Sequence, residues 1–257
     1  MKRQQSASAE RSKAAGGAPM RRRDFLAVAS AVLATPLGAF SQSPGYPAEV
    51  AGIKLPASPL CAKAYELCRS SAPPFLLNHS MRTYLFGALH AAHHHQGFNV
   101  ESAFTAAVLH DIGLLPAFAS KEGSFEVDGA NRAEEFSREQ GTSVAESEKI
   151  WNAIVMHDMR FAIPSHQSPE ATLVAAGAGA DVIGPDEGMF DRTALDEVVA
   201  VFPRLKFKQQ FIALLANHCE RKPGAQTGTW LEGFCRQHSS VPTSGTEKAI
   251  LSAPFAE

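Results

Sequence analysis

The 257-residue sequence lacks the patterns that mark several large protein classes. It holds no glycine-rich phosphate loop, no internal repeat and no heptad pattern, so it gives no sign of a nucleotide-binding loop, a solenoid or a coiled coil. Its longest apolar stretch is about fifteen residues, shorter than the roughly twenty that span a membrane. Alternating strand patterns are also missing, apart from one short candidate at residues 125–127.

Cysteine is scarce, with four residues in the chain. None has the close spacing of a zinc–thiolate site, so we do not expect a metal on sulfur. Cys61 and Cys68 share one expected helix, about 10 Å apart, which is too far for a disulfide. Cys219 and Cys235 fall on neighbouring expected helices, where they either form a disulfide or remain small buried residues.

Positive charge is outnumbered by negative charge in the body of the chain. Residues 1–41 hold seven Lys or Arg and two acidic residues, which leaves 17 basic and 24 acidic residues for the remainder. A body with a net charge of −7 repels polyanions, so we expect no nucleic-acid partner.

The basic front end has the form of a targeting segment. Arg21-Arg22-Arg23-Asp24-Phe25-Leu26 precedes a moderately apolar run and several small residues. This pattern resembles a twin-arginine export signal, and the alternative is an amphipathic or disordered arm. We predict a signal peptide over residues 1–41 and a periplasmic or secreted protein with no membrane association after its removal.

The rest of the chain predicts helices. Residues 42–59 are proline-rich and suggest a linker or wrapping arm, residues 60–238 a helical domain, and residues 239–257 a flexible tail. Capping residues and helix breakers divide the domain into nine helices, expected at about 59–70, 78–97, 100–113, 128–140, 144–158, 169–184, 193–202, 206–220 and 229–238. The expected caps include Ser58, Asn99, Asp128 and Ser143. The fold class is therefore all-α, with a single domain.

An apolar run, residues 106–109, delivers His110 and Asp111 to the end of one of these helices, before Gly113. Burying an imidazole and a carboxylate is costly unless something binds them, and a divalent cation would. Asp181 lies in a Gly/Ala-rich helix that lets other backbones come close, so we expect it to be buried and paired. With His79 upstream and His157 between, these residues form an ordered series.

A second group of histidines follows His79 on the same expected helix, at positions 90, 93, 94 and 95. His90 and His94 share a face by their spacing of four, which permits metal chelation. They lie turns away from His79, and no acidic residue accompanies them in the sequence. We therefore interpret this group as a solvated surface.

The ordered series resembles the HD superfamily of metal-dependent phosphohydrolases and related enzymes, whose signature is a His, a later His-Asp doublet and a final Asp. The match runs over roughly residues 60–220. Finer motifs resemble the cyanamide hydratase-like branch of that superfamily. These motifs are Asn78-His79-Ser80-x-Arg82-Thr83-Tyr84, His110-Asp111-Ile112-Gly113-Leu114, residues 125–130 and Ala180-Asp181-Val182-Ile183-Gly184.

The resemblance implies a helical bundle around one divalent ion held by His79, His110, Asp111 and Asp181. Zinc is our first expectation, and iron, manganese and nickel suit the same ligands. Such an ion lowers the pKa of bound water and polarises a substrate. His157 is expected to act as a proton shuttle or substrate donor, unless it only caps its helix. Arg82, three residues after His79, would hold an anionic group, brace a ligand carboxylate or form a surface ion pair.

Three functions stay open at this point. Leu114 stands where many phosphodiester-cleaving relatives carry Lys, and its apolar surroundings favour addition of water to a small nitrile- or amide-like molecule. A phosphohydrolase would need a basic pocket from Arg82, Lys121 and Arg160, with His157 and His166 for a second metal. The third option is a non-catalytic metal-binding protein. The expected partner is a small molecule, and a homo-oligomer is left open.

Overall fold

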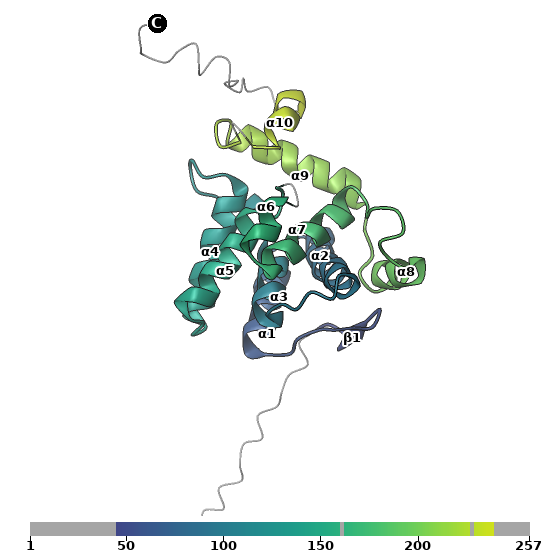
Figure 1. Ribbon diagram of the computed structural model, residues 1–257. Coiled ribbons are helices and arrows are strands. Elements are labelled where there is room, and N and C mark those ends of the chain that lie inside the picture. The colour runs from purple at the N-terminus through teal and green to yellow at the C-terminus, as the bar shows by residue number, and fades with distance from the viewer. Residues whose placement is uncertain (1–44, 160–161, 227–228, 239–257) are drawn as a thin grey trace, which may run out of the picture. The chain divides into compact units, whose positions relative to one another are not determined.

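The computed structural model describes residues 45–159, 162–226 and 229–238, which are coloured in Figure 1. This part of the chain is mostly helical, which agrees with the all-α prediction. It also contains one small hairpin, which was not predicted. No helix in it is both long enough and apolar enough to span a membrane. The predicted signal peptide and the predicted C-terminal tail lie outside the described residues.

The proline-rich segment ends in two short antiparallel strands, β1 (Glu49–Val50) and β2 (Ile53–Lys54). Ala51 and Gly52 both have positive φ, which allows the tight turn between them. The sequence predicted no strands here, because two-residue strands are too short to show alternation. Tyr46 is buried, and its ring lies 4.8 Å from that of Tyr65, so the segment packs on the helical core.

Capping signals predicted the starts of two of the first three helices. Helix α1 (Pro59–Ser71) is capped by Ser58, and α3 (Val100–Leu109) by Asn99, as predicted. Helix α2 (Pro74–His93) begins directly after Pro73, four residues before the predicted start. The chain leaves α3 at His110 and forms a 3-10 turn, η1 (Ile112–Leu114), instead of continuing the helix to Gly113.

The remaining helices are α4 (Phe125–Glu139), α5 (Val144–Val155), α6 (Ala162–Gln167), α7 (Pro169–Val182), α8 (Arg192–Val201), α9 (Phe207–Arg221) and α10 (Glu232–His238). Helix α6 was not predicted. The prediction that Asp128 caps α4 is wrong, because Ser124 accepts the hydrogen bond from Val127 N. Residues 125–127 form the first turn of this helix and not an extended piece. Asp128 instead accepts from Lys222 Nζ, 2.5 Å away.

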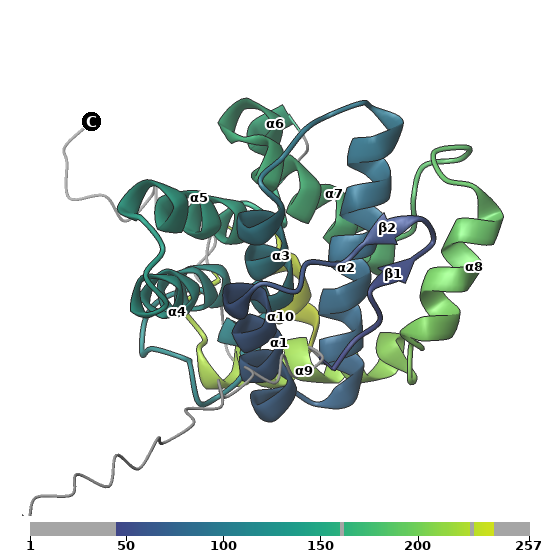
Figure 2. The same cartoon turned by 90° about the horizontal axis from the view of Figure 1, so that it is seen from below.

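Helices α2 and α7 lie side by side at the centre, with α4 and α5 on one side and α8 on the other (Figure 1). Figure 2 shows the β1–β2 hairpin running between α2 and α8. Glycines make the central crossing close: a Cβ on Gly87 would lie 2.3 Å from Leu173 O, and one on Gly177 1.9 Å from Thr83 O. The expected close approach at the Gly/Ala-rich helix is thus confirmed.

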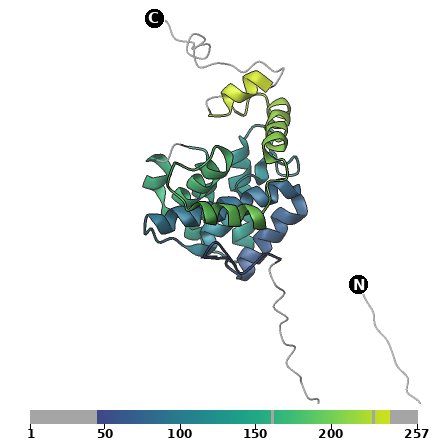
Figure 3. The ribbon, with the colours of Figure 1, turned by 90° about the vertical axis from the view of Figure 1, so that its right-hand side faces the viewer.

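Helices α9 and α10 form the end of the chain's described part, with α10 beyond α9 (Figure 3). A disulfide between Cys219 and Cys235 joins these two helices, which confirms the first of the two alternatives for this pair. Cys61 and Cys68 are buried and free, as their spacing predicted.

Candidate metal centre

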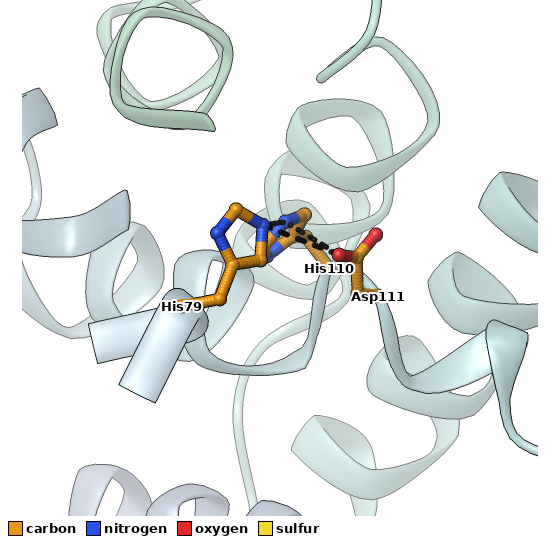
Figure 4. A group of neighbouring side chains, drawn as sticks. All are labelled: His79, His110 and Asp111. Atoms are coloured by element: carbon orange, nitrogen blue, oxygen red, sulfur yellow. Dashed lines mark hydrogen bonds and ion pairs between the residues drawn. The ribbon is translucent and has the colours of Figure 1, made fainter. Parts of the chain in front are cut away.

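Three predicted ligands meet in the interior of the helical unit. His79 comes from α2, His110 from the C-terminal end of α3, and Asp111 from the start of the following 3-10 turn. All three are at most 2% exposed, and their side chains point toward one another (Figure 4). His79 Nε2 lies 3.2 Å from His110 Nε2, and Asp111 Oδ2 lies 3.3 Å from each nitrogen.

The hydrogen bonds of the two rings fix which nitrogens face this centre. His110 Nδ1 donates to Ala107 O at 2.8 Å, a local contact available because His110 sits just past the helix end. His79 Nδ1 donates to Asp181 Oδ2 at 2.7 Å. With the hydrogens on Nδ1, the neutral rings turn their Nε2 lone pairs toward each other and toward Asp111.

Lone pairs that converge at this distance repel unless a positive charge lies between them. Asp111 Oδ2 is buried and accepts no hydrogen bond from the described residues, so this oxygen can also act as a ligand of a cation. Two imidazole nitrogens and one carboxylate oxygen are ligands that suit a divalent transition metal. The three side chains therefore fit a metal ion, and their donor atoms all lie within 4.8 Å of one another.

The electrostatics favour positive charge in this cluster, whether as a proton on His79 or as a bound cation. Burial opposes the charged form of His79, but the contacts of its ring with Asp111 and Asp181 outweigh burial and raise the pKa of His79. Burial likewise opposes ionisation of Asp111, and the adjacent His110 and His79 hold its pKa well below the usual range. The cluster as a whole attracts positive charge.

Asp181 does not join this group of three. Its carboxylate lies behind His79, where Oδ2 also accepts from Arg82 Nη2 at 2.7 Å and Oδ1 accepts from Arg82 Nε at 2.8 Å and Arg204 Nη1 at 2.5 Å. The paired, buried state expected from the sequence is confirmed. A carboxylate on the far nitrogen of a ligating histidine orients the ring and increases its basicity. Direct ligation by Asp181 stays a prediction.

Arg82 is fully buried and lies behind Asp181. Its Nη1 donates to Phe202 O at 2.9 Å, and its guanidinium lies 5.5 Å from the Phe207 ring. These contacts match one of the three roles left open by the sequence, bracing a carboxylate. The guanidinium contacts Asp181 and backbone carbonyls and is not among the described residues that line the pocket, and a catalytic role for Arg82 stays a prediction.

His157 lies beside the centre, just past the end of α5. Its Nδ1 donates to Ile154 O at 2.6 Å, the same local contact that His110 makes, and its Nε2 lies 3.7 Å from Asp111 Oδ1. Burial, then the neighbouring His110, lowers its pKa to about 4. His157 therefore offers an uncharged ring with a free acceptor nitrogen beside Asp111, while its catalytic role stays a prediction.

A pocket of about 470 Å³ opens onto these residues. His79, His110, Asp111, His157 and Asp158 supply its polar groups. Small residues of α7 leave the space, and apolar side chains form the walls: Phe125, Met159, Ala175, Ala178, Gly179, Val182, Ile183, Phe211 and Trp230. Among the described residues that line it, none is Lys or Arg.

Two carboxyl groups beside the pocket were not assigned a chemical role from the sequence. Glu126 is 3% exposed, and neither of its oxygens makes a hydrogen bond to the described residues. Burial, then the charge of Asp158, raises its pKa to about 7. Burial also raises the pKa of Asp158. The adjacent His157-Asp158 pair, a second His-Asp doublet in the sequence, was the available signal.

Two of the residues that a phosphohydrolase was expected to use lie away from the pocket. Lys121 and His166 are exposed and do not line the pocket, and Arg160 lies outside the described residues.

A family model described as an HD domain matches residues 76–248 of the chain. No curated protein matches it.

Proposed function

Because the chain belongs to the HD-domain family, whose members are typically metal-dependent hydrolases, we propose that it is a metal-dependent enzyme adding water to a small, uncharged nitrile- or amide-like molecule. The finer motifs, which resemble those of the cyanamide hydratase-like branch, support this proposal. The protein's export by residues 1–41 is part of it, and replacing Arg22 and Arg23 with Lys would then retain the protein in the cytoplasm.

The observation that carries the proposal is the pocket above His79, His110 and Asp111. Its described lining has its polar side chains at and beside the metal centre, and no Lys or Arg side chain. Phosphoester substrates carry charge that enzymes pair with Arg, Lys or additional metal ions. Arg82 and Arg204 are committed to Asp181, so neither supplies that charge. A neutral substrate with an apolar portion fits this pocket better than a nucleotide.

The chain's own residues divide the work of the reaction. A divalent ion held by the three buried donors would supply a Lewis acid that activates water near neutral pH. His157, uncharged at pH 7, orients a water or substrate hydrogen through its free Nε2. Glu126, with a pKa of about 7, can exchange a proton near neutral pH, where such a group is most effective, and burial raises the pKa of the neighbouring Asp158. The apolar walls exclude bulk water.

The test is elemental analysis of purified protein followed by a substrate panel with the metal found. We expect stoichiometric metal and turnover of nitriles or amides, with little on nucleotides or p-nitrophenyl phosphate. An Asp111→Asn variant should lose metal and turnover, whereas the matched surface variant Asp196→Asn, 65% exposed at its side chain, should lose neither. Faster cleavage of phosphoesters, or full activity without metal, would overturn the proposal.

A further inference from the structure

We propose that the histidines at the C-terminal end of α2 form a second, surface metal site, in which His90, His94 and Asp186 bind a late first-row divalent cation such as Zn²⁺, Ni²⁺ or Cu²⁺. All three side chains line one pocket of about 610 Å³. His90 follows His79 by eleven residues on the same helix, which is about 16 Å along the axis. The site is thus separate from the buried centre and independent of the proposed activity.

The two imidazoles are arranged as a helical chelating pair. His90 and His94 are one turn apart on α2, and their ring centroids lie 4.5 Å from each other. The ring of His93 lies 4.9 Å from that of His94, which places a third imidazole at the edge of the group. Burial, then the neighbouring His94 and His93, lowers the pKa of His90.

The carboxylate comes from a distant part of the chain. Gly184 has a φ of +101° just after α7, where the chain turns back toward the end of α2. Asp186 then lies on the wall of the pocket that His90 and His94 line, and its charge acts on His90. No acidic partner stands near these histidines in the sequence, because this carboxylate is far from them along the chain.

The donor set selects the class of cation. Two imidazoles and one carboxylate favour zinc, nickel and copper over magnesium and calcium, which prefer oxygen ligands alone. In the described residues these donors are less tightly grouped than those of the buried centre. His94 and Asp186 are exposed, so rotation of their side chains brings them to a common ion, with water completing its coordination. We therefore expect weaker, exchangeable binding.

The experiment counts metal ions on the untagged full-length protein. Calorimetric titration with Zn²⁺ should show two equivalents, one tight and one weaker, and His90→Ala/His94→Ala should lose the weaker one only. His95→Asn is the matched control, because this neighbouring imidazole is absent from the pocket and Asn tolerates its positive φ. The control should retain both equivalents.

Two further measurements cover the remaining outcomes. The exposed His94 alone can be replaced by Gln, a change that α2 tolerates, and at least a tenfold weaker second equivalent is expected. With the buried centre first filled with Zn²⁺, one added equivalent of Cu²⁺ should show nitrogen hyperfine coupling in the wild-type protein, and the double variant should lose it. Absence of the weaker equivalent in the wild-type protein, or its persistence in the double variant, would overturn the proposal. Loss of nitrile or amide turnover bears only on the buried centre.

Discussion

Replacing Glu126 with glutamine should stabilise the protein at pH 8 and leave its stability at pH 4 unchanged. Glu126 is buried, makes no hydrogen bond to the described residues and faces the charge of Asp158. These conditions penalise the ionised carboxylate, and glutamine removes that charge while keeping the shape of the side chain.

The magnitude follows from the shift in pKa. The folded pKa of about 7 is above the reference value of 4.5, so the folded state binds the proton more tightly than the unfolded state. The stability linked to this proton is fully present below pH 4.5 and is lost as the pH rises through 7. At about 1.4 kcal/mol per pKa unit, the loss approaches 3 kcal/mol at pH 8. That free energy corresponds to about 6–12 °C in melting temperature for a domain of this size.

The assay is thermal unfolding of wild type and Glu126→Gln in matched buffers from pH 4 to 8. Only the difference between the two proteins is used, so the titration of groups that do not interact with Glu126 cancels. Glu139→Gln, on the exposed end of the same helix, is the control and should show no pH-dependent difference. A Glu126→Gln effect that is constant across this range, or a variant less stable than the wild type at pH 8, would refute the reasoning.

Three other changes probe the site and its supports. Arg82→Met should cost about 3 kcal/mol in urea denaturation, since it leaves Asp181 buried without its bidentate partner, and recovery of wild-type stability in this variant would contradict that role. His157→Gln should retain stoichiometric metal but lower turnover about 100-fold, and unchanged turnover would exclude a catalytic role. Cys219→Ser should lower stability by about 3 kcal/mol and remove the sensitivity of the melting temperature to reductant, because it opens a loop of 16 residues.

Local signals in the sequence were sufficient for most helix boundaries. Ser58, Asn99 and Ser143 each accept a hydrogen bond from the first turn of the helix they were expected to cap. The signal failed at α4, where Ser124 and Asp128 are both good capping residues and only tertiary contacts decide between them. Lys222, remote in sequence, binds Asp128 and so removes it from the capping role.

The site shows a similar division. The types and order of His79, His110 and Asp111 were readable from the chain, because buried ligands must follow an apolar run or stand near one. The orientation of Asp181 was not, since its position in a helix does not reveal that two arginines already occupy its oxygens. The spacing of Arg82 gave its helix face but not its depth.

The glycine contacts between α2 and α7 have a consequence for how ligands enter. These two helices carry His79 and Asp181, and Gly87 and Gly177 leave no room between their backbones. Their amides should exchange with solvent hydrogen only through global unfolding, while those of the peripheral α10 exchange through local opening. Trp230, which precedes α10, closes one wall of the pocket. We expect this wall to open and close many times during the lifetime of an undisturbed metal centre.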